Sequence, residues 1–458
     1  MRTERDTLGE VRVPDDALYG AQTQRAVENY PISGLREHPV FIRSFILLKK
    51  AAALANRELD ALDARLADSI VAACDELLGN ADKYRPQFVV DVFQAGAGTS
   101  FNMNVNEVIA NLANPDRGTY KPVHPNDHVN MAQSTNDVFP TAIRIAALLL
   151  LNELLPALDG LAMALGDRGE AFAGVIKSGR THLQDAVPVT LGQEFKAYAS
   201  AVARATRQLA VGATELRELG IGGTAAGTGM NAPRGYRHAV IKHLNAMTGL
   251  ELVAADDLRE AMQSQLPVAA VSAALRNLAL ELTRIANDLR LLASGPQTGF
   301  AEIILPAVQP GSSIMPGKVN PSMLECLNQV CFHIIGADTA IAFAVQAGQL
   351  ELNVMMPLMA FELLFSIDIL KNYLPVFVEK SIRGIEADRA QCEAYYISSP
   401  SLATALNPII GYAKAAELAK ESAKSGTPIP TLLREKKLLS DAEIARIFTP
   451  EFLAGQAD

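Results

Sequence analysis

The central part of the chain carries apolar residues at a spacing that strongly limits its fold. Two runs repeat spacings of 4, 3, 4, 3 and 4 residues: Val271, Leu275, Leu278, Leu282, Ile285, Leu289, and Leu191, Phe195, Tyr198, Val202, Ala205, Leu209. This period is typical of helices that pack along one another in a bundle. The chain is therefore predicted to be mainly α-helical, with long helices in its middle.

Composition narrows the class of protein further. The 458 residues are 49% hydrophobic, which supports a substantial core, and the net charge of −9 argues against a general nucleic-acid surface. The four cysteines show no metal-ligand spacing. The N-terminus "MRTERDTLGE" has no apolar segment, and the densest apolar stretch, "IRIAALLLLNELL", is interrupted by Arg144, Asn152 and Glu153. We expect a soluble, cytoplasmic protein that spans no membrane.

Polar segments rich in turn-forming residues separate the apolar runs. They are "GAGTSFNMNVNE" at 96–107, "HPNDHVNMAQSTND" at 124–137, "GRTHLQD" at 179–185 and "GSSIMPGKVNP" at 311–321. Any one alone could be a solvated connection. Together they are dense in hydroxyl and amide groups and poor in carboxylates, which favours a site that binds the oxygen atoms of an anion. The glycine run "GGTAAGTG" at 222–229 follows no strand pattern, so it indicates a dinucleotide site only weakly.

The short hairpins or loops are predicted elsewhere. "EVRVPDDALYGAQTQ" and "GTYKPVHPNDHVN" are the best candidates, and "THLQDAVPVTLGQ" is predicted to be non-helical because Pro188 interrupts it. The segment 311–321 contains two prolines and two glycines, which exclude a regular helix there.

These motifs resemble the aspartase/fumarase superfamily. The resemblance rests on "GSSIMPGKVNP", "GRTHLQDAVPVTLGQE", "QSTNDVFPTA" and "GAGTSFNMNVNEV", and it runs from "LGEVRVPDDALYGAQTQRA" to "TALNPIIGY". It implies an all-α, three-domain fold with domains at 1–134, 135–388 and 389–458. It also implies a homotetramer whose central helices form a twenty-helix core, with active sites where three subunits meet.

The resemblance also implies an elimination that leaves fumarate, with roles for particular residues. Ser312 would be the general base, and Lys318 and Asn320 would bind the carboxylate beside the leaving group. Thr99, Ser134, Thr135 and Ser313 would donate to the carboxylate that becomes an enediolate. His182, paired with Glu325, would act on the leaving-group side with Asn136, and Thr181 would lie beside them. Gly311 and Gly317 would let the loop close over the substrate.

The leaving group is less sharply indicated. Ala97, Thr135, "NQVCF" and "AGQLELNV" resemble the aspartase branch, which releases ammonia from L-aspartate, whereas "HPND" and "GAQTQRA" resemble the fumarase branch, which releases water from L-malate. Gln297, Met356 and the pair Leu266–Pro267 depart from both branches. They leave open a lyase that acts on an N-substituted aspartate.

Two further alternatives concern the role of the protein and a second site. A catalytically silent bundle is disfavoured, because Ser312, Lys318 and His182 are all present. His124, Asn126 and Asp127 resemble a peripheral anion site of fumarases, although a plain turn fits them equally well. The expected reaction needs a base, donors and a closing loop, so neither an organic cofactor nor a metal site is predicted.

Overall fold

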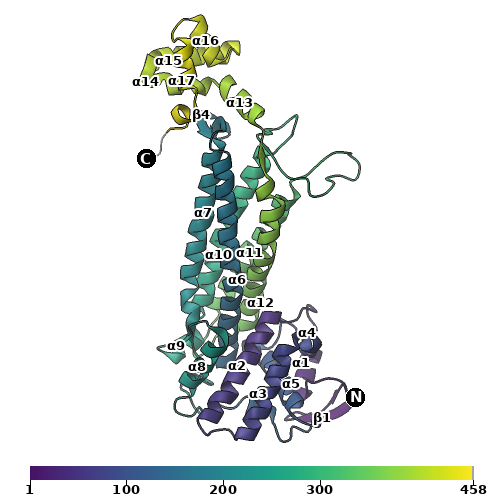
Figure 1. Cartoon of the computed structure of the whole chain (residues 1–458). Coiled ribbons are helices and arrows are strands. Elements are labelled where there is room, and N and C mark those ends of the chain that lie inside the picture. Colours follow the sequence, from purple (N-terminus) through teal and green to yellow (C-terminus); the bar gives the residue numbers. More distant parts are fainter. Residues whose placement is uncertain (456–458) are drawn as a thin grey trace. The chain divides into compact units, whose positions relative to one another are not determined.

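Helices dominate the computed structural model, which describes residues 1–455 (Figure 1). This confirms the mainly helical class, but four small two-stranded sheets accompany the helices in the described residues. The chain divides into two compact units, each assembled from separate stretches of sequence. The first contains residues 1–155, 207–277 and 332–371, and the second contains 156–206, 278–331 and the chain from 372 onward. The three-domain division at 134 and 388 stays a prediction.

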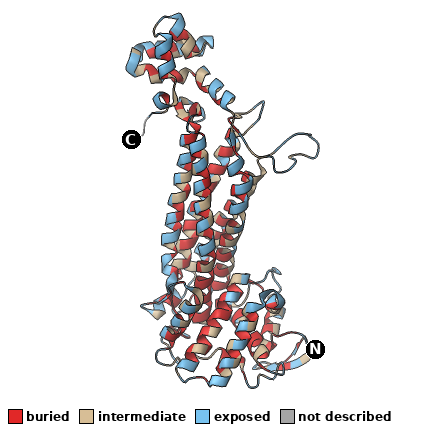
Figure 2. Ribbon diagram, viewed as in Figure 1, coloured by how far each residue is buried: buried red, intermediate tan, exposed pale blue. Residues whose placement is uncertain are grey.

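Five long helices carry the apolar runs. They are α6 (Thr135–Ala171), α7 (Leu191–Gly212), α10 (Leu266–Leu292), α11 (Ser322–Gln346) and α12 (Met356–Lys380). Each unit contains a segment of all five. The residues of both predicted seams are buried along α7 and α10, as the periodicity requires, and buried and exposed residues alternate along these helices in Figure 2.

Besides its parts of the five long helices, the first unit contains a hairpin, shorter helices and a parallel strand pair. β1 (Arg2–Asp6) and β2 (Gly9–Val13) form an N-terminal hairpin, and only its second strand falls in the segment 10–24 where a hairpin or loop was expected. The helices are α1 (Ala21–Asn29), α2 (Pro39–Glu58), α3 (Ala64–Gly79), α4 (Ala81–Tyr84), α5 (Thr99–Ala113), α8 (Tyr236–Thr248) and α9 (Leu258–Gln263), and the parallel pair is β5 (Glu218–Leu219) with β6 (Val253–Ala254). α2 packs against both α3 and α8.

An aromatic cluster fixes the start of α5 and α6 in this unit. Phe41 and Phe45 of α2 contact Phe101 of α5 and Phe139 of α6, with ring centroids 5.0 to 5.6 Å apart. All four rings are fully buried. Edge-to-face contacts of this kind add to the burial of apolar area, so the two helix starts are held firmly.

The second unit adds a hairpin and the C-terminal helices. β3 (Ile176–Thr181) pairs with β4 (Gln184–Thr190), and β7 (Ile303–Ile304) pairs with β8 (Glu386–Ala387). A separate core holds together α13 (Arg389–Ser398), α14 (Asn407–Ile410), α15 (Tyr412–Ser425), α16 (Ile429–Glu435), α17 (Asp441–Ile447) and α18 (Pro450–Leu453). Leu402, Leu418, Leu433 and Ile447 are buried in that core.

The apolar stretch at 143–155 is part of a helix that extends well beyond it on both sides. It belongs to the 37-residue helix α6, and α6, α10 and α11 are each long and apolar enough to cross a membrane by length and composition. In α6 the most apolar window is 78% buried inside the protein, so its apolar side chains are explained by the core. The corresponding figures for α10 and α11 are 39% and 33%.

Candidate active site

The segment 311–321 forms a loop that is closed at its base. The Gly311 N–H donates to the Lys318 carbonyl at 2.8 Å, and Asn320 Nδ2 donates to the Gly311 carbonyl at 2.7 Å. A Cβ atom at Gly311 would lie 2.6 Å from the Lys318 carbonyl oxygen, so only glycine permits this closure. Gly317 has φ +82°, which again favours glycine. The two glycines therefore shape the closed base and the turn of this loop. Its closure over a substrate stays a prediction.

Ser312 sits inside the loop with two donors directed at its hydroxyl. The backbone N–H groups of Ile314 and Met315 donate to Ser312 Oγ at 3.2 and 3.1 Å. Such donors favour the anionic form of an oxygen over the neutral form, because charge-assisted hydrogen bonds are the stronger ones. Ser312 and the exposed Lys318 line an open hollow of about 430 Å³. The arrangement is suited to a serine that accepts a proton.

His182 lies at the tip of the β3–β4 hairpin. It forms a two-residue turn with Leu183, and both residues have positive φ, +55° and +57°. Asn-Gly and similar pairs are the usual residues in such a turn, so two larger side chains at positive φ here indicate strain that serves another purpose. His182 and Thr181 are exposed. The expected non-helical segment is therefore a hairpin that presents a histidine to its surroundings.

Glu325 is in the first turn of α11, where it lies 3.9 Å from Arg290. Its ion pair within the chain, among the described residues, is thus with α10 and not with His182. The predicted His182–Glu325 pair remains a prediction.

The other predicted donors lie in the first unit. Thr99 is the first residue of α5, and Thr135 is the first residue of α6. The segment 96–107, predicted as a polar, turn-rich connection, is therefore mostly helix, and Phe101 through Asn111 are buried. Here the polar residues Asn102 and Asn104 are internal hydrogen-bonding groups, which a sequence pattern cannot distinguish from surface groups.

The turn before Thr99 is held by close packing. The Ala97 N–H donates to the Val354 carbonyl at 2.9 Å, and Ala97 has φ +61°. A Cβ atom at Gly98, whose φ is +86°, would lie 2.0 Å from the Phe139 ring. The glycine-rich turn therefore packs against the Phe139 ring and leads directly into Thr99, which is exposed at the first position of α5.

Asp137 fixes the Ser134–Asn136 segment. Its carboxylate accepts from the N–H groups of Ser134 at 2.9 Å, Gly222 at 3.0 Å and Thr224 at 2.9 Å, and Asn136 Nδ2 donates to the Ala225 carbonyl at 2.8 Å. Burial raises the pKa of Asp137 to about 6, and these N–H groups oppose that rise. The glycine run at 222–229 is thus a platform under the predicted donors and follows no dinucleotide pattern.

The buried Lys49 side chain binds residues that directly precede the Ser134–Asn136 segment. Lys49 Nζ donates to Asn130 Oδ1 at 2.9 Å and to Gln133 Oε1 at 3.0 Å, and Asn102 Nδ2 donates to Thr135 Oγ1 at 3.0 Å. Burial lowers the pKa of Lys49 to about 7. Sequence reasoning missed Asp137 and Lys49. Asp137 stood in the quoted "QSTND" motif, whereas Lys49 carried no local signal.

The predicted residues thus fall into two groups. Thr99, Ser134, Thr135 and Asn136 belong to the first unit, whereas the second unit holds the remaining seven, namely Thr181, His182, Ser312, Ser313, Lys318, Asn320 and Glu325. Loop 311–321 brings four of these together in sequence and space.

Comparisons with known proteins show the family of this chain. Residues 9–336 match the family described as "Lyase", and residues 402–455 match "Fumarase C C-terminus". The chain belongs to the fumarate lyase superfamily. It is 47% identical over 98% of its length to aspartate ammonia-lyases of Bacillus subtilis and Helicobacter pylori strain J99, which are covered to 95% and 97%. The protein is therefore a lyase, and the family resemblance of its motifs is confirmed.

Solved structures agree with this assignment. A fumarate lyase:delta crystallin from Brucella melitensis, crystallised with cobalt, matches with a TM-score of 0.95 and 47% identity, covering 99% of this chain and 100% of that one. A class II fumarase from Schistosoma mansoni matches with a TM-score of 0.94 and 35% identity, covering 99% of both chains. Within residues 1–455, no group of three or more His, Cys, Asp or Glu side chains could hold a metal ion.

The residues that depart from the usual superfamily pattern occupy different environments. Met356 is fully buried as the first residue of α12, and Gln297 is exposed in the turn after α10. Leu266 is exposed at the start of α10. Met356 is thus explained by packing, whereas Gln297 is exposed.

The "HPND" segment forms a self-contained helical turn at Pro125–Val129. His124 Nδ1 accepts from the Asp127 N–H at 3.2 Å and lies 3.3 Å from the Asp127 carboxylate. Because the histidine nitrogen already accepts from a backbone N–H within the turn, the geometry favours a plain turn over an anion site.

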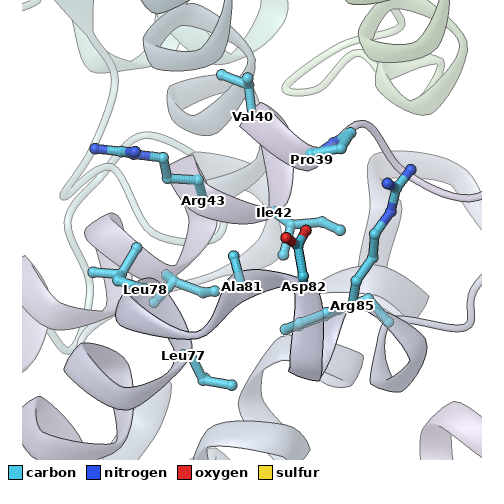
Figure 3. Close-up of a pocket in the computed structure, with 11 residues that line it drawn as sticks. Pro39, Val40, Ile42, Arg43, Leu77, Leu78, Ala81, Asp82 and Arg85 are labelled. Atoms are coloured by element: carbon cyan, nitrogen blue, oxygen red, sulfur yellow. The ribbon is translucent and has the colours of Figure 1, made fainter.

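One apolar pocket lies apart from all predicted site residues. It has a volume of about 240 Å³ and is lined by α2, α3 and α4 residues, including Ile42, Leu77 and Leu78, with Arg43, Asp82 and Arg85 around them (Figure 3). It contains no predicted base or donor for a dicarboxylate. The candidate site is therefore assigned to the hydroxyl-rich segments.

Proposed function

We propose that this lyase is an aspartate ammonia-lyase that converts L-aspartate reversibly into fumarate and ammonia. The observation that carries the proposal is the 47% identity, over nearly the whole chain, to several aspartate ammonia-lyases. The identity to the class II fumarase is 35%. Ala97 and Thr135 favoured ammonia as the leaving group; Ala97 lies in the turn just before α5, and Thr135 is the first residue of α6.

In the proposed mechanism, Ser312 as an alkoxide removes a proton from the carbon beside one carboxylate. The electron pair left on that carbon moves into the carboxylate, giving an enediolate, and then forms the double bond as the bond to nitrogen breaks. The N–H groups of Ile314 and Met315 support the role of Ser312, because they stabilise the charged oxygen before substrate arrives. Thr99, Ser134, Thr135 and Ser313 would donate to the enediolate oxygens.

The other carboxylate would be bound by Lys318 and Asn320, and the departing amine would meet His182, Thr181 and Asn136. Asn320 also braces the loop through Gly311, so binding and loop shape are linked through one side chain. Glu325 would orient His182 from another subunit. No step requires a group beyond these side chains, the substrate and water.

We also infer that the chain acts as a homotetramer with shared sites. The two groups of residues lie in different units, and large apolar side chains are exposed along the bundle helices: Leu280, Leu291, Phe332, Phe343, Phe365 and Val376. Such a series on three helices is suited to subunit contacts, since a soluble monomer seldom exposes it. The twenty-helix core and the cytoplasmic location remain predictions.

The test of function is a paired assay with L-aspartate and L-malate under identical conditions, with fumarate and ammonia both quantified. Turnover of aspartate with equal amounts of fumarate and ammonia supports the proposal. Turnover of malate alone would make the protein a fumarase. Silence on both, with turnover of an N-substituted aspartate, would attach significance to Gln297.

A second experiment tests the base and the sharing of sites. Ser312→Ala should abolish turnover while the tetramer persists in size-exclusion chromatography with light scattering. Ser312→Ala mixed and reassembled with Ser134→Ala should regain part of the activity, because some sites would then contain both native residues. Undiminished activity of Ser312→Ala would contradict the mechanism and favour a role independent of this serine.

A further inference from the structure

A buried cluster of charges lies in the second unit outside the residues assigned above. Glu302 is fully buried and accepts two parallel hydrogen bonds from Arg180, Nη1 to Oε2 at 2.9 Å and Nη2 to Oε1 at 3.0 Å. Lys177 Nζ lies 3.1 Å from Glu302 Oε2 and 2.8 Å from Glu194 Oε1. Two cations thus face two carboxylates, and the cluster is formally neutral.

Aromatic rings hold the Arg180 guanidinium in a fixed plane. Its central carbon lies 4.2 Å from the Phe300 ring centre and 5.4 Å from the Tyr395 ring centre. The Tyr395 hydroxyl donates to the Gly299 carbonyl at 3.3 Å, so the stacking ring is itself anchored. A planar fork with aromatic contacts is a geometric constraint that lysine cannot reproduce.

The backbone of Glu302 is also tied to the C-terminal part of the chain. Its carbonyl accepts from the Asp388 N–H at 3.0 Å and from Cys392 Sγ at 3.6 Å. Four segments therefore meet at this residue: β3, α7, the stretch at 299–303 and the start of α13. The region around Glu302 can move only if several of these contacts break together.

The two partners stand next to the two catalytic segments proposed above. Arg180 immediately precedes Thr181 and His182, after a register shift in the β3–β4 ladder between Ser178 and Arg180. Glu302 is the last residue before β7, from which the chain runs directly into the Ser312 loop. One ion pair thus joins the end of β3, beside the His182 turn, to the segment that precedes the Ser312 loop.

We propose that Arg180 and Glu302 are a positioning pair, which fixes the His182 turn and the Ser312 loop relative to each other. A buried ion pair gives little net stability, because desolvation offsets most of the attraction. Its bidentate geometry, in contrast, specifies orientation, and an error of about 1 Å in a catalytic group can cost about 100-fold in rate. The proposal rests on the proposed function, since it presumes that both segments serve the elimination.

The first test uses variants that keep every charge. Arg180→Lys removes the fork and the stacking, and Glu302→Asp shortens the arm by one methylene. Each should lower kcat at least about tenfold and change KM less, because groups are misplaced in the transition state. The double variant should be little worse than either single one, since both break the same pair. Arg284→Lys is the matched control, because Arg284 bonds Glu281 and stacks on Tyr198 at an exposed position; it should leave kcat unchanged.

The second test measures the solvent exposure of the Ser312 loop and does not depend on turnover. The chain has no tryptophan, so Ile314→Trp, at the exposed tip of the loop, adds a single tryptophan that can be excited selectively over the 10 tyrosines. Acrylamide quenching should change about twofold when Arg180→Lys or Glu302→Asp is added to this background, and should not change with Arg284→Lys.

The outcomes of these tests distinguish a positioning role of the pair from a contribution to folding stability alone. A lower unfolding midpoint with unchanged kcat per folded protein and unchanged quenching would overturn the proposal. If the native protein does not turn over aspartate, the proposed function fails, but the quenching comparison still decides whether the pair holds the loop.

Discussion

The buried carboxyl of Glu37 leads to an unusual expectation, namely that removing a charge stabilises the protein. Glu37 is almost fully buried, and its side-chain oxygen accepts from Gln94 Nε2 at 2.9 Å. Burial raises the pKa of Glu37 from its ordinary value of 4.5 to about 8, and the hydrogen bond from Gln94 only partly opposes this. Glu37→Gln keeps an oxygen that can accept from Gln94 while it removes the ionisable group.

The size of the effect follows from linkage. A rise in pKa from 4.5 to about 8, at about 1.4 kcal/mol for each pH unit, corresponds to about 5 kcal/mol. The sign is set by proton binding: between pH 4.5 and 8 the folded chain holds a proton that the unfolded chain releases. The contribution of Glu37 to folding stability is therefore most favourable below pH 4.5, falls as pH rises, and is lowest above about pH 8.

The assay is thermal unfolding of the native protein and Glu37→Gln from pH 5 to 9, followed by circular dichroism. With an unfolding entropy of about 2.1 cal/mol/K per residue, 5 kcal/mol corresponds to a rise of about 5 °C in Tm at pH 9. The gain should shrink towards pH 5. Glu28→Gln, at an exposed position on α1, is the matched control and should show no such pH dependence. An equal change at every pH, or a loss at pH 9, would refute the reasoning.

Three other variants test the packing, the donors and the assembly. Gly98→Ala should destabilise the fold by about 3 kcal/mol or more and abolish activity, because its Cβ would overlap the buried Phe139 ring; Gly160→Ala, in open space on α6, should not. Asp137→Asn should raise KM about tenfold or more, since an amide NH₂ would face backbone donors; a KM within twofold of native would contradict the platform role. Phe343→Asp, at a side chain 66% exposed in one chain, should dissociate the tetramer in light scattering, whereas a persistent tetramer would exclude α11 from the contact.

Local sequence rules were sufficient where a pattern repeats or a backbone is unusual. The apolar spacing in α7 and α10 predicted buried helical faces, because side chains three and four apart share one face. The prolines and glycines of 311–321 excluded a helix, and the structure shows Gly311 in a contact that a side chain could not make.

The same rules failed where burial decides the meaning of a polar residue. Asn102, Asn104 and Asn106 stand in a segment predicted as a polar, turn-rich connection, but they lie in a buried helix, where their amide nitrogens donate to internal acceptors. Lys49 carried no sequence signal, since its role depends on Asn130 and Gln133, more than 80 residues away.

Sequence by itself therefore determined the helical class, the family and the chemistry that its loops can offer. These depend on residue type and spacing, which the chain carries locally. The tertiary structure alone decided which groups touch: that Glu302 holds Arg180, that Asp137 gathers the N–H groups of two loops, and that Ile314 and Met315 face Ser312. Such contacts depend on distances between separate segments, which packing of the whole fold sets and no local pattern records.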